Sequence, residues 1–195
     1  MNTRQKDIEL VVIGGSAGCL PVLITILKSL PTNFSVPIAI VIHRQRNVVS
    51  EMVHILAAAN QFKEIIEPDD KETISPCCIY LAPQNYHLLI EHDKTFSLDY
   101  SEAIKYSRPS IDVTFESAAQ VYRQKLVAIL LSGANNDGTA GLLSVVEKGG
   151  VAIAQSPATA QYPVMPLAAI ENVTGLKVLD PDEISAYVKD LVVNP

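Results

Sequence analysis

The 195-residue chain is long enough for one α/β domain with a substantial core, and its 48% hydrophobic residues argue against intrinsic disorder. The formal net charge of −6 argues against general nucleic-acid binding. The three cysteines, Cys19, Cys77 and Cys78, form neither a disulfide framework nor a zinc pattern, which fits a reducing cytosol. The first ten residues lack the apolar core of a signal peptide, and no apolar run reaches the ~20 residues that cross a bilayer. We therefore expect a soluble cytoplasmic protein without membrane insertion.

Apolar, β-forming runs alternate with helical patterns along the chain, which is typical of a parallel α/β fold. Strands are predicted at 9–14, 37–43, 62–67, 77–82, 126–133, 151–155 and 176–179. Helices are predicted at 20–30, 48–60, 107–125 (with Ser110 as N-cap), within 135–150, at 164–173 and at 181–193.

The segment 86–100 has a different pattern. Tyr86, Leu88 and Ile90 alternate with polar neighbours, and a similar alternation follows a turn-like sequence at 92–94. This pattern predicts an antiparallel β-hairpin inserted into the βα series. The predicted fold class is therefore α/β, with three α/β/α layers, a doubly wound and mostly parallel sheet, and an inserted hairpin. We expect a single domain over 1–195.

Three polar residues follow predicted strands of this sheet. Ser16 follows the first strand, His43 ends the second, and Asp137 comes just after the strand at 126–133. In an open α/β sheet the carboxyl ends of the strands line the ligand-binding crevice, so these side chains should meet at one edge. Together they are the inventory of a Ser-His-Asp triad.

Each of these residues also has a simpler interpretation. The run GGSAG at 14–18 could cradle a phosphate at a helix N-terminus, although it fits neither the dinucleotide nor the P-loop pattern. His43 could be a hydrogen-bonded histidine at a strand end, and Asp137 could be a helix N-cap in an Asn-Asn-Asp-Gly turn. Three such residues at three strand ends favour catalysis.

GGSAG also satisfies the G-x-S-x-G pattern of a nucleophile elbow. However, the chain order is Ser, His, Asp, whereas α/β-hydrolases order the triad Ser, Asp, His. Only fifteen residues precede Ser16, too few for the upstream oxyanion-hole loop of that fold. We therefore expect a different fold that performs the same chemistry.

The chain contains, in this order, the blocks VVIGGSAG, IVIH, IYLAPQNYHLLI, RPSIDVTFESAA, ILLSGANNDGTAGL and GGVAIAQSPATAQYPVMPLAAI. Together, from about residue 9 to about 192, they resemble the catalytic domain of bacterial chemotaxis protein-glutamate methylesterases. The resemblance implies a doubly wound parallel sheet with an antiparallel hairpin, and a triad of Ser16, His43 and Asp137.

The resemblance also implies the reaction, which is hydrolysis of glutamate γ-methyl esters on the cytoplasmic helices of a chemoreceptor, with deamidation of certain receptor glutamines. It implies no cofactor, so hydrolysis should survive EDTA. The partners it implies are a methyl-accepting chemotaxis receptor and, outside this chain, a separate receiver or methyltransferase protein. We assign the oxyanion hole to the backbone N–H groups of Ala17 and Ala134, because such donors stabilise acyl-transfer intermediates.

The substrate cleft is expected to include Arg44, Arg108 and Met165. Arg44 and Arg46 would make the rim beside His43 basic and attract a glutamate-rich helix, although a solvated loop explains them equally well. The chain departs from the family pattern at Cys19, where a second glycine is usual and where we expect a small buried residue. It departs again at 134–135, where Ala-Asn replaces Met-Gly.

The chain begins about eight residues before its first strand and shows no receiver domain, so we expect activity that does not respond to a phosphodonor. Two other functions stay open on the sequence. One is a non-catalytic signalling or docking module, and the other is a serine esterase for small molecules. An intact triad favours catalysis over the first, but residue patterns do not separate a protein substrate from a small one.

Overall fold

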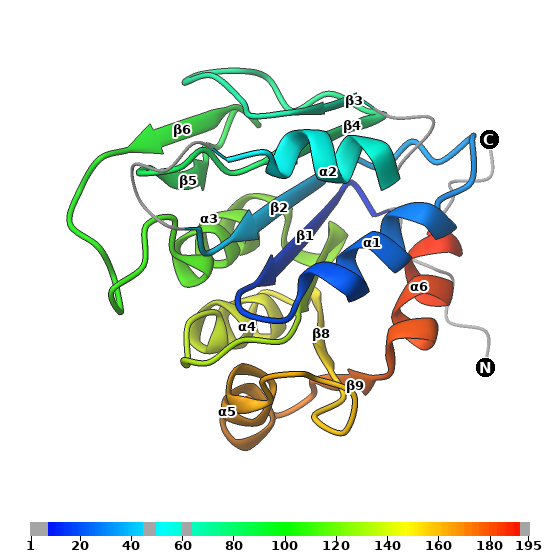
Figure 1. The fold of residues 1–195 in the computed structure, drawn as a ribbon. Helices are drawn as coiled ribbons and strands as arrows, with labels where there is room; N and C mark the ends of the chain where they lie inside the picture. The colour runs from blue at the N-terminus through cyan, green and yellow to red at the C-terminus, as the bar shows by residue number, and fades with distance from the viewer. Residues whose placement is uncertain (1–7, 45–49, 60–63, 192–195) are drawn as a thin grey trace.

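The computed structural model describes residues 8–44, 50–59 and 64–191 (Figure 1). Seven parallel strands form one sheet in the order β3-β4-β2-β1-β7-β8-β9. Their bounds are β1 Leu10–Gly15, β2 Ile38–Ile42, β3 Glu64–Ile66, β4 Cys78–Leu81, β7 Leu126–Leu130, β8 Val151–Gln155 and β9 Lys177–Leu179. The central strands are buried on both faces, which explains their nearly continuous runs of valine, isoleucine and leucine.

Helices cover both faces of the sheet and create two apolar cores (Figure 1). One face carries α1 Leu20–Ser29, α2 Met52–Ala59 and α6 Pro181–Lys189. The other carries α3 Ile111–Tyr122, α4 Thr139–Glu147 and α5 Val164–Asn172. Alternate residues of β1 divide between these cores, because successive side chains of a strand point to opposite faces. The three-layer fold class is thereby confirmed.

The predicted hairpin is also confirmed. Strands β5 His87–Ile90 and β6 Phe96–Asp99 pair antiparallel, with Leu88 opposite Leu98 and Ile90 opposite Phe96. Leu88, Ile90 and Phe96 are buried in the core beneath α3, which accounts for the period of two seen in the sequence.

The helix expected within 107–125 begins at Ile111, so Ser110 occupies the predicted N-cap position. Residues 107–110 form a connecting loop. The physical reason is Pro109, because a proline disfavours helical geometry in the residue before it. This loop brings Ser107 to the edge of the sheet where β1 and β2 end, as shown by its contact with His43.

The strand order places a topological switch between β1 and β7. β2, β4 and β3 lie outward from β1 on one side, and the chain then returns to add β7, β8 and β9 on the other. In open α/β sheets the crevice at such a point, outside the carboxyl ends of the strands, is where ligands bind. No helix among the described residues is long and apolar enough to cross a membrane.

Candidate active site

Asp137 lies in the loop after β7, and its carboxylate has more hydrogen-bond partners than any other side chain of the site. Its Oδ2 atom lies 2.8 Å from Nε2 of His43 and accepts the backbone N–H of Ile111 at 2.7 Å. Its Oδ1 atom accepts the hydroxyl of Ser110 at 2.9 Å and the N–H of Asp112 at 3.1 Å. The carboxylate therefore sits on the N-terminus of α3 as well as on the histidine. Towards α4 its Oδ1 atom accepts the N–H of Gly138 at 3.1 Å, but Gly138 is the N-cap of that helix, so Asp137 is not the N-cap of α4 as the simpler interpretation supposed.

These contacts determine the ionisation of Asp137. Burial alone raises the pKa of this carboxyl group, but the hydrogen bonds from His43 and from the amides of Ile111 and Asp112 outweigh burial. The result is a pKa of about 2, below the usual 3.8. The positive end of the α3 dipole favours the same charged form. Asp137 is thus a fixed anion at neutral pH.

We predict that Asp137 makes folding stability depend on pH in acid. Because its pKa is lower in the folded state, its stabilising contribution is present above pH 3.8 and is lost as the pH falls through about 2. The size follows from the pKa change and is roughly 2 kcal/mol. Urea unfolding at pH 7, 4, 3 and 2 should show a stability gap between wild type and Asp137→Asn that closes in acid. Parallel curves for the two proteins would refute this assignment.

His43 follows β2 and has a partner on each ring nitrogen. Asp137 accepts from Nε2, so the neutral tautomer carries its proton there and leaves Nδ1 as the base. The Oγ atom of Ser107 lies 3.3 Å from Nδ1. The side chain is 13% exposed, so the ring is largely enclosed but still reachable from solvent. This is the geometry of a general base oriented by a carboxylate.

Ser16 lies beside His43 because of the strand register. Gly15 of β1 pairs with Ile42 of β2, and the N–H of His43 donates to the carbonyl of Gly15 at 3.2 Å. The next residues, Ser16 and His43, therefore end neighbouring strands about 4.8 Å apart. Within the described part of the chain no hydrogen bond joins the Ser16 hydroxyl to the ring. Catalytic hydrogen bonds in free enzymes are often long and tighten when substrate binds.

The backbone after Ser16 suits an oxyanion hole. The carbonyl of Ser16 accepts the N–H of Cys19 at 3.2 Å, so the N–H of Ala17, across the same planar trans peptide, points the other way. Ser132 holds the following peptide, because its hydroxyl donates to the Ala17 carbonyl at 2.8 Å. Among the described residues no hydrogen bond uses the N–H groups of Ala17 or Ala134. Both amides are therefore available to a developing oxyanion.

Met165 does not line an open cleft, contrary to the sequence prediction. Its side chain is fully buried, and its N–H donates to the carbonyl of Gly133 at 3.1 Å. A Cβ atom on Gly133 would lie 1.7 Å from the Met165 sulfur and 3.0 Å from the Ser16 Cβ. Met165 thus packs against the turn at Gly133 beside Ser16, and this close packing is possible because residue 133 is a glycine.

The expected basic rim is also different from the prediction. The Arg44 side chain is only 5% exposed, and its guanidinium pairs with Glu67 at 2.7 Å and with the carbonyl of Ala82. Its charge is therefore used within the fold and is not available to a substrate. Arg46 lies outside the described residues.

Arg108 mainly fixes the loop that follows the hairpin. Its Nη1 atom donates to the carbonyls of Tyr100 at 2.9 Å and Ser101 at 2.5 Å, and its guanidinium lies 4.0 Å from the Tyr100 ring centroid. The loop so fixed leads to Ser107 and Ser110, which contact His43 and Asp137. A role of Arg108 in the cleft itself stays a prediction.

The start of α1 is poorly suited to cradle a phosphate. Pro21 lies in the first turn and lacks an N–H donor, and the N–H of Cys19 already bonds to Ser16. Cys19 is buried, as expected, and burial raises the pKa of its thiol to about 12. These features favour the nucleophile interpretation of the turn.

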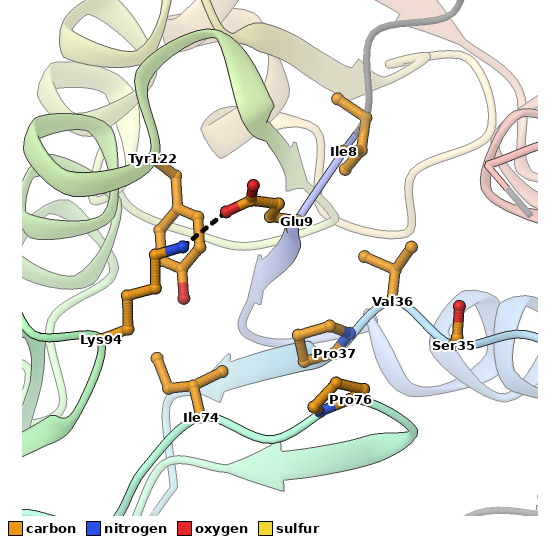
Figure 2. A pocket seen from close by; sticks show the side chains of 9 residues that line it. All are labelled: Ile8, Glu9, Ser35, Val36, Pro37, Ile74, Pro76, Lys94 and Tyr122. Carbon is orange, nitrogen blue, oxygen red and sulfur yellow. Dashed lines mark hydrogen bonds and ion pairs between the residues drawn. The ribbon is translucent and has the colours of Figure 1, made fainter. Parts of the chain in front are cut away.

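A hollow of about 300 Å³ lies away from this chemistry, at the amino ends of the strands (Figure 2). Its apolar wall includes Val36, Ile74 and Pro76, and at its side Lys94 pairs with Glu9 at 2.7 Å. Ser35 also lines it, but no histidine does that could act as the base for this hydroxyl, so the Ser-His-Asp set at the carboxyl edge defines the candidate site. Within the described ranges no three His, Cys, Asp or Glu side chains gather to hold a metal ion.

Two residues near the triad were not singled out from the sequence. Ser132 belongs to the quoted block ILLSGANNDGTAGL, so a signal was present, but its link to the Ala17 carbonyl is a tertiary contact. Ser107 immediately precedes the block RPSIDVTFESAA and carried no signal of its own. Its position depends on the path of the loop after β6.

Comparison with known proteins gives one consistent family. The CheB methylesterase family model matches residues 11–188. A Leptospira interrogans protein, provisionally named protein-glutamate methylesterase/protein-glutamine glutaminase, is 46% identical over 177 residues, which are 91% of each chain. A Thermotoga maritima protein-glutamate methylesterase/protein-glutamine glutaminase is 34% identical over 84% of this chain but only 48% of its own length. The longer relative therefore contains a further region that this chain does not match.

The structural comparison agrees with the sequence comparisons. The crystal structure of the Thermotoga maritima CheB methylesterase catalytic domain superimposes with a TM-score of 0.86 at 32% identity, covering 95% of this chain and 99% of that one. The fold, the extent of the match and the three strand-end residues lead to the same conclusion: the chain belongs to the CheB methylesterase family.

Proposed function

We propose that this methylesterase acts through Ser16 as nucleophile, His43 as general base and acid, and Asp137 as the carboxylate that orients His43. The reaction is hydrolysis of protein glutamate γ-methyl esters, with glutamine deamidation as a second activity of the same acyl transfer. The observation that carries the proposal is the 2.8 Å contact between His43 Nε2 and a buried Asp137, beside the serine that ends the neighbouring strand.

The chemistry proceeds in two acyl-transfer steps. The Ser16 oxygen attacks the γ-carbonyl carbon while Nδ1 of His43 accepts the hydroxyl proton, and the resulting oxyanion lies near the N–H groups of Ala17 and Ala134. Collapse breaks the ester C–O bond, and methanol leaves with the proton from Nδ1. A water molecule then gives a proton to Nδ1 and attacks the acyl carbon. Collapse breaks the bond to the Ser16 oxygen, which takes the proton back from Nδ1, and leaves the glutamate side chain of the substrate free. With a glutamine substrate, ammonia leaves in place of methanol.

The anionic state of Asp137 matters in both steps. When Nδ1 takes a proton the ring becomes an imidazolium, and the carboxylate at Nε2 stabilises this charge at short range in a buried setting. The mechanism uses only groups of this chain and water. The direct test is methanol release from methylated receptor membranes by wild type and by Ser16→Ala.

We further propose that the substrate is a methylated helix of a methyl-accepting chemoreceptor, met in the cytoplasm. The surface beside Ser16 supports a protein substrate over a small ester. Tyr162, Val164 and Leu167 are exposed apolar residues at the start of α5. The carbonyl of Tyr162 accepts the N–H of Gly133, which touches Ser16. An exposed apolar row whose first residue is hydrogen-bonded to the turn beside Ser16 is suited to contact a large partner.

Replacing Leu167 by asparagine should separate the two substrate classes. Loss of one exposed apolar contact should raise KM for methylated receptor about three- to tenfold. The kcat/KM for a small ester, N-acetylglutamate γ-methyl ester N-methylamide, should not change, because Leu167 lies outside the triad. Ile55→Asn, at an equally exposed apolar site on α2, is the matched control. An equal effect of Leu167→Asn on both substrates, or none on receptor, would favour the small-molecule esterase.

A further inference from the structure

Ser107 occupies the side of the His43 ring opposite Asp137. Its Oγ atom lies 3.3 Å from Nδ1, and Asp137 Oδ2 lies 2.8 Å from Nε2. We propose that Ser107 is a positioning residue, which holds the imidazole from its basic nitrogen while Asp137 holds it from the other. This inference rests on the proposed role of His43.

The loop that presents Ser107 is built tightly. Ile104 and Ser107 exchange two backbone hydrogen bonds, of 3.1 Å and 2.8 Å, around Lys105 and Tyr106. These two central residues have φ values of 48° and 64°, which is a left-handed backbone conformation that residues other than glycine rarely adopt. Backbone strain of this kind persists only where the surroundings fix it, and it is concentrated at functional sites.

Lys105 supplies the surroundings that fix this turn. Its Nζ atom pairs with Asp112 Oδ2 at 2.7 Å and donates to the carbonyl of Asn136 at 3.1 Å. Asp112 is in the first turn of α3, and Asn136 precedes Asp137. The turn that places Ser107 on one side of the ring is therefore tied to both segments that place Asp137 on the other. The contacts of Lys105 therefore hold Ser107 and Asp137, the two partners of His43, at a fixed separation.

A hydroxyl suits this position because it can both donate and accept. It donates to Nδ1 when the imidazole is neutral, and after a rotation about the C–O bond it accepts from Nδ1–H when the ring is charged. The contact can therefore persist while the ring gains and loses its proton. The 3.3 Å length makes it a weak hydrogen bond that the Ser16 hydroxyl or the leaving group can replace during transfer.

The same geometry argues that Ser107 is not the nucleophile. Its own N–H donates to the carbonyl of Ile104 at 2.8 Å, and Pro109, two residues later, has no N–H. The available amides of Ala17 and Ala134 lie beside Ser16 instead. Of residues 107–109 only Arg108 then offers a backbone N–H, whereas two amides are assigned beside Ser16, so an oxyanion is better stabilised at Ser16.

The test compares Ser107→Ala, which removes the hydroxyl, with Ser107→Thr, which keeps it. Ser107→Ala should lower kcat for the small ester about three- to tenfold, the effect of one neutral hydrogen bond, with KM unchanged. Ser107→Thr should retain kcat within about twofold of wild type. The matched control is Ser101→Ala, because Ser101 lies in the same loop but its hydroxyl bonds to Asp99 at 2.7 Å.

A second readout separates positioning from general loss of structure. The ¹⁵N resonance of His43 Nδ1 should shift in Ser107→Ala and not in Ser101→Ala, with both proteins equally resistant to urea. Wild-type kcat in Ser107→Ala, or the same loss in Ser101→Ala, would overturn the inference while leaving the triad intact. Failure of the triad itself would show separately, as activity retained in Ser16→Ala. A serine-directed phosphonate found on Ser107 would overturn both.

Discussion

Ser16→Ala should lower kcat for receptor demethylation by about 10⁴- to 10⁶-fold, because the acyl-enzyme cannot form without the hydroxyl oxygen. KM should change little, because the Ser16 side chain is small and the apolar row on α5 remains. Any turnover of the variant above the uncatalysed rate of hydrolysis would come from stabilisation of the oxyanion by the amides of Ala17 and Ala134. Methanol release from methylated receptor membranes is the measurement, and ammonia release from receptor glutamine should fall in parallel.

Covalent labelling makes this result specific to the nucleophile. A serine-directed phosphonate should add one adduct to wild type, located at Ser16 by peptide mass, and none to Ser16→Ala. Ser144→Ala, on α4, is the matched control and should retain both activity and labelling. Turnover of Ser16→Ala within tenfold of wild type would exclude an acyl-enzyme on this residue. A chain that neither turns over nor labels in wild-type form would instead favour the non-catalytic docking module.

The positions of Ser16, His43 and Asp137 were predictable from sequence because the carboxyl ends of parallel strands lie at the same edge of the sheet. Each residue follows an apolar run long enough to identify a buried strand, and the carboxyl ends of such strands lie together regardless of the connecting helices. The sequence could not give the register that places Ser16 beside His43. That register depends on the pairing of Gly15 with Ile42, which is set by packing across the whole sheet.

The errors concern long side chains and loops. Arg44 follows a strand in a polar stretch and therefore suggested either a basic rim or a solvated loop. In the fold its long side chain reaches Glu67 and the carbonyl of Ala82. Contacts of this kind between distant residues produce no periodic pattern in the sequence. Met165 lies in the block that resembles the family, but nothing in that block indicates that the side chain packs beneath Gly133. Ser107 was missed because no periodicity governs the path of a loop between a hairpin and a helix.

The several roles of Asp137 explain why its sequence context was ambiguous. The Asn-Asn-Asp-Gly turn suggested a helix cap, and the strand-end position suggested a triad member. The structure shows both kinds of contact at once, because the carboxylate accepts amides from the N-terminus of α3 and holds His43. The helix it caps is a different one from the helix that follows it in sequence. The cap of α3 and the proposed orientation of His43 therefore depend on the same anion.

Asp137→Asn should lower kcat by about 10⁴-fold although the two side chains have the same shape. An amide has one acceptor oxygen, whereas both Asp137 oxygens accept hydrogen bonds from the fold. If the NH₂ group faces His43, it donates to Nε2 and moves the ring proton to Nδ1, where it blocks acceptance from Ser16. If it faces the other way, it meets the N–H of Asp112. Either orientation removes the negative charge that stabilises the imidazolium.

The kinetic and spectroscopic readouts for Asp137→Asn should agree. The kcat should fall while KM for the small ester stays near wild type, and the ¹⁵N spectrum of His43 should report protonation at Nδ1 in place of Nε2. Asp180→Asn is the matched control, since Asp180 also lies at a helix N-terminus, that of α6, but contacts Glu183 and no catalytic group. That variant should lose some stability and no activity. Activity of Asp137→Asn within tenfold of wild type would mean that His43 is oriented by something other than this carboxylate.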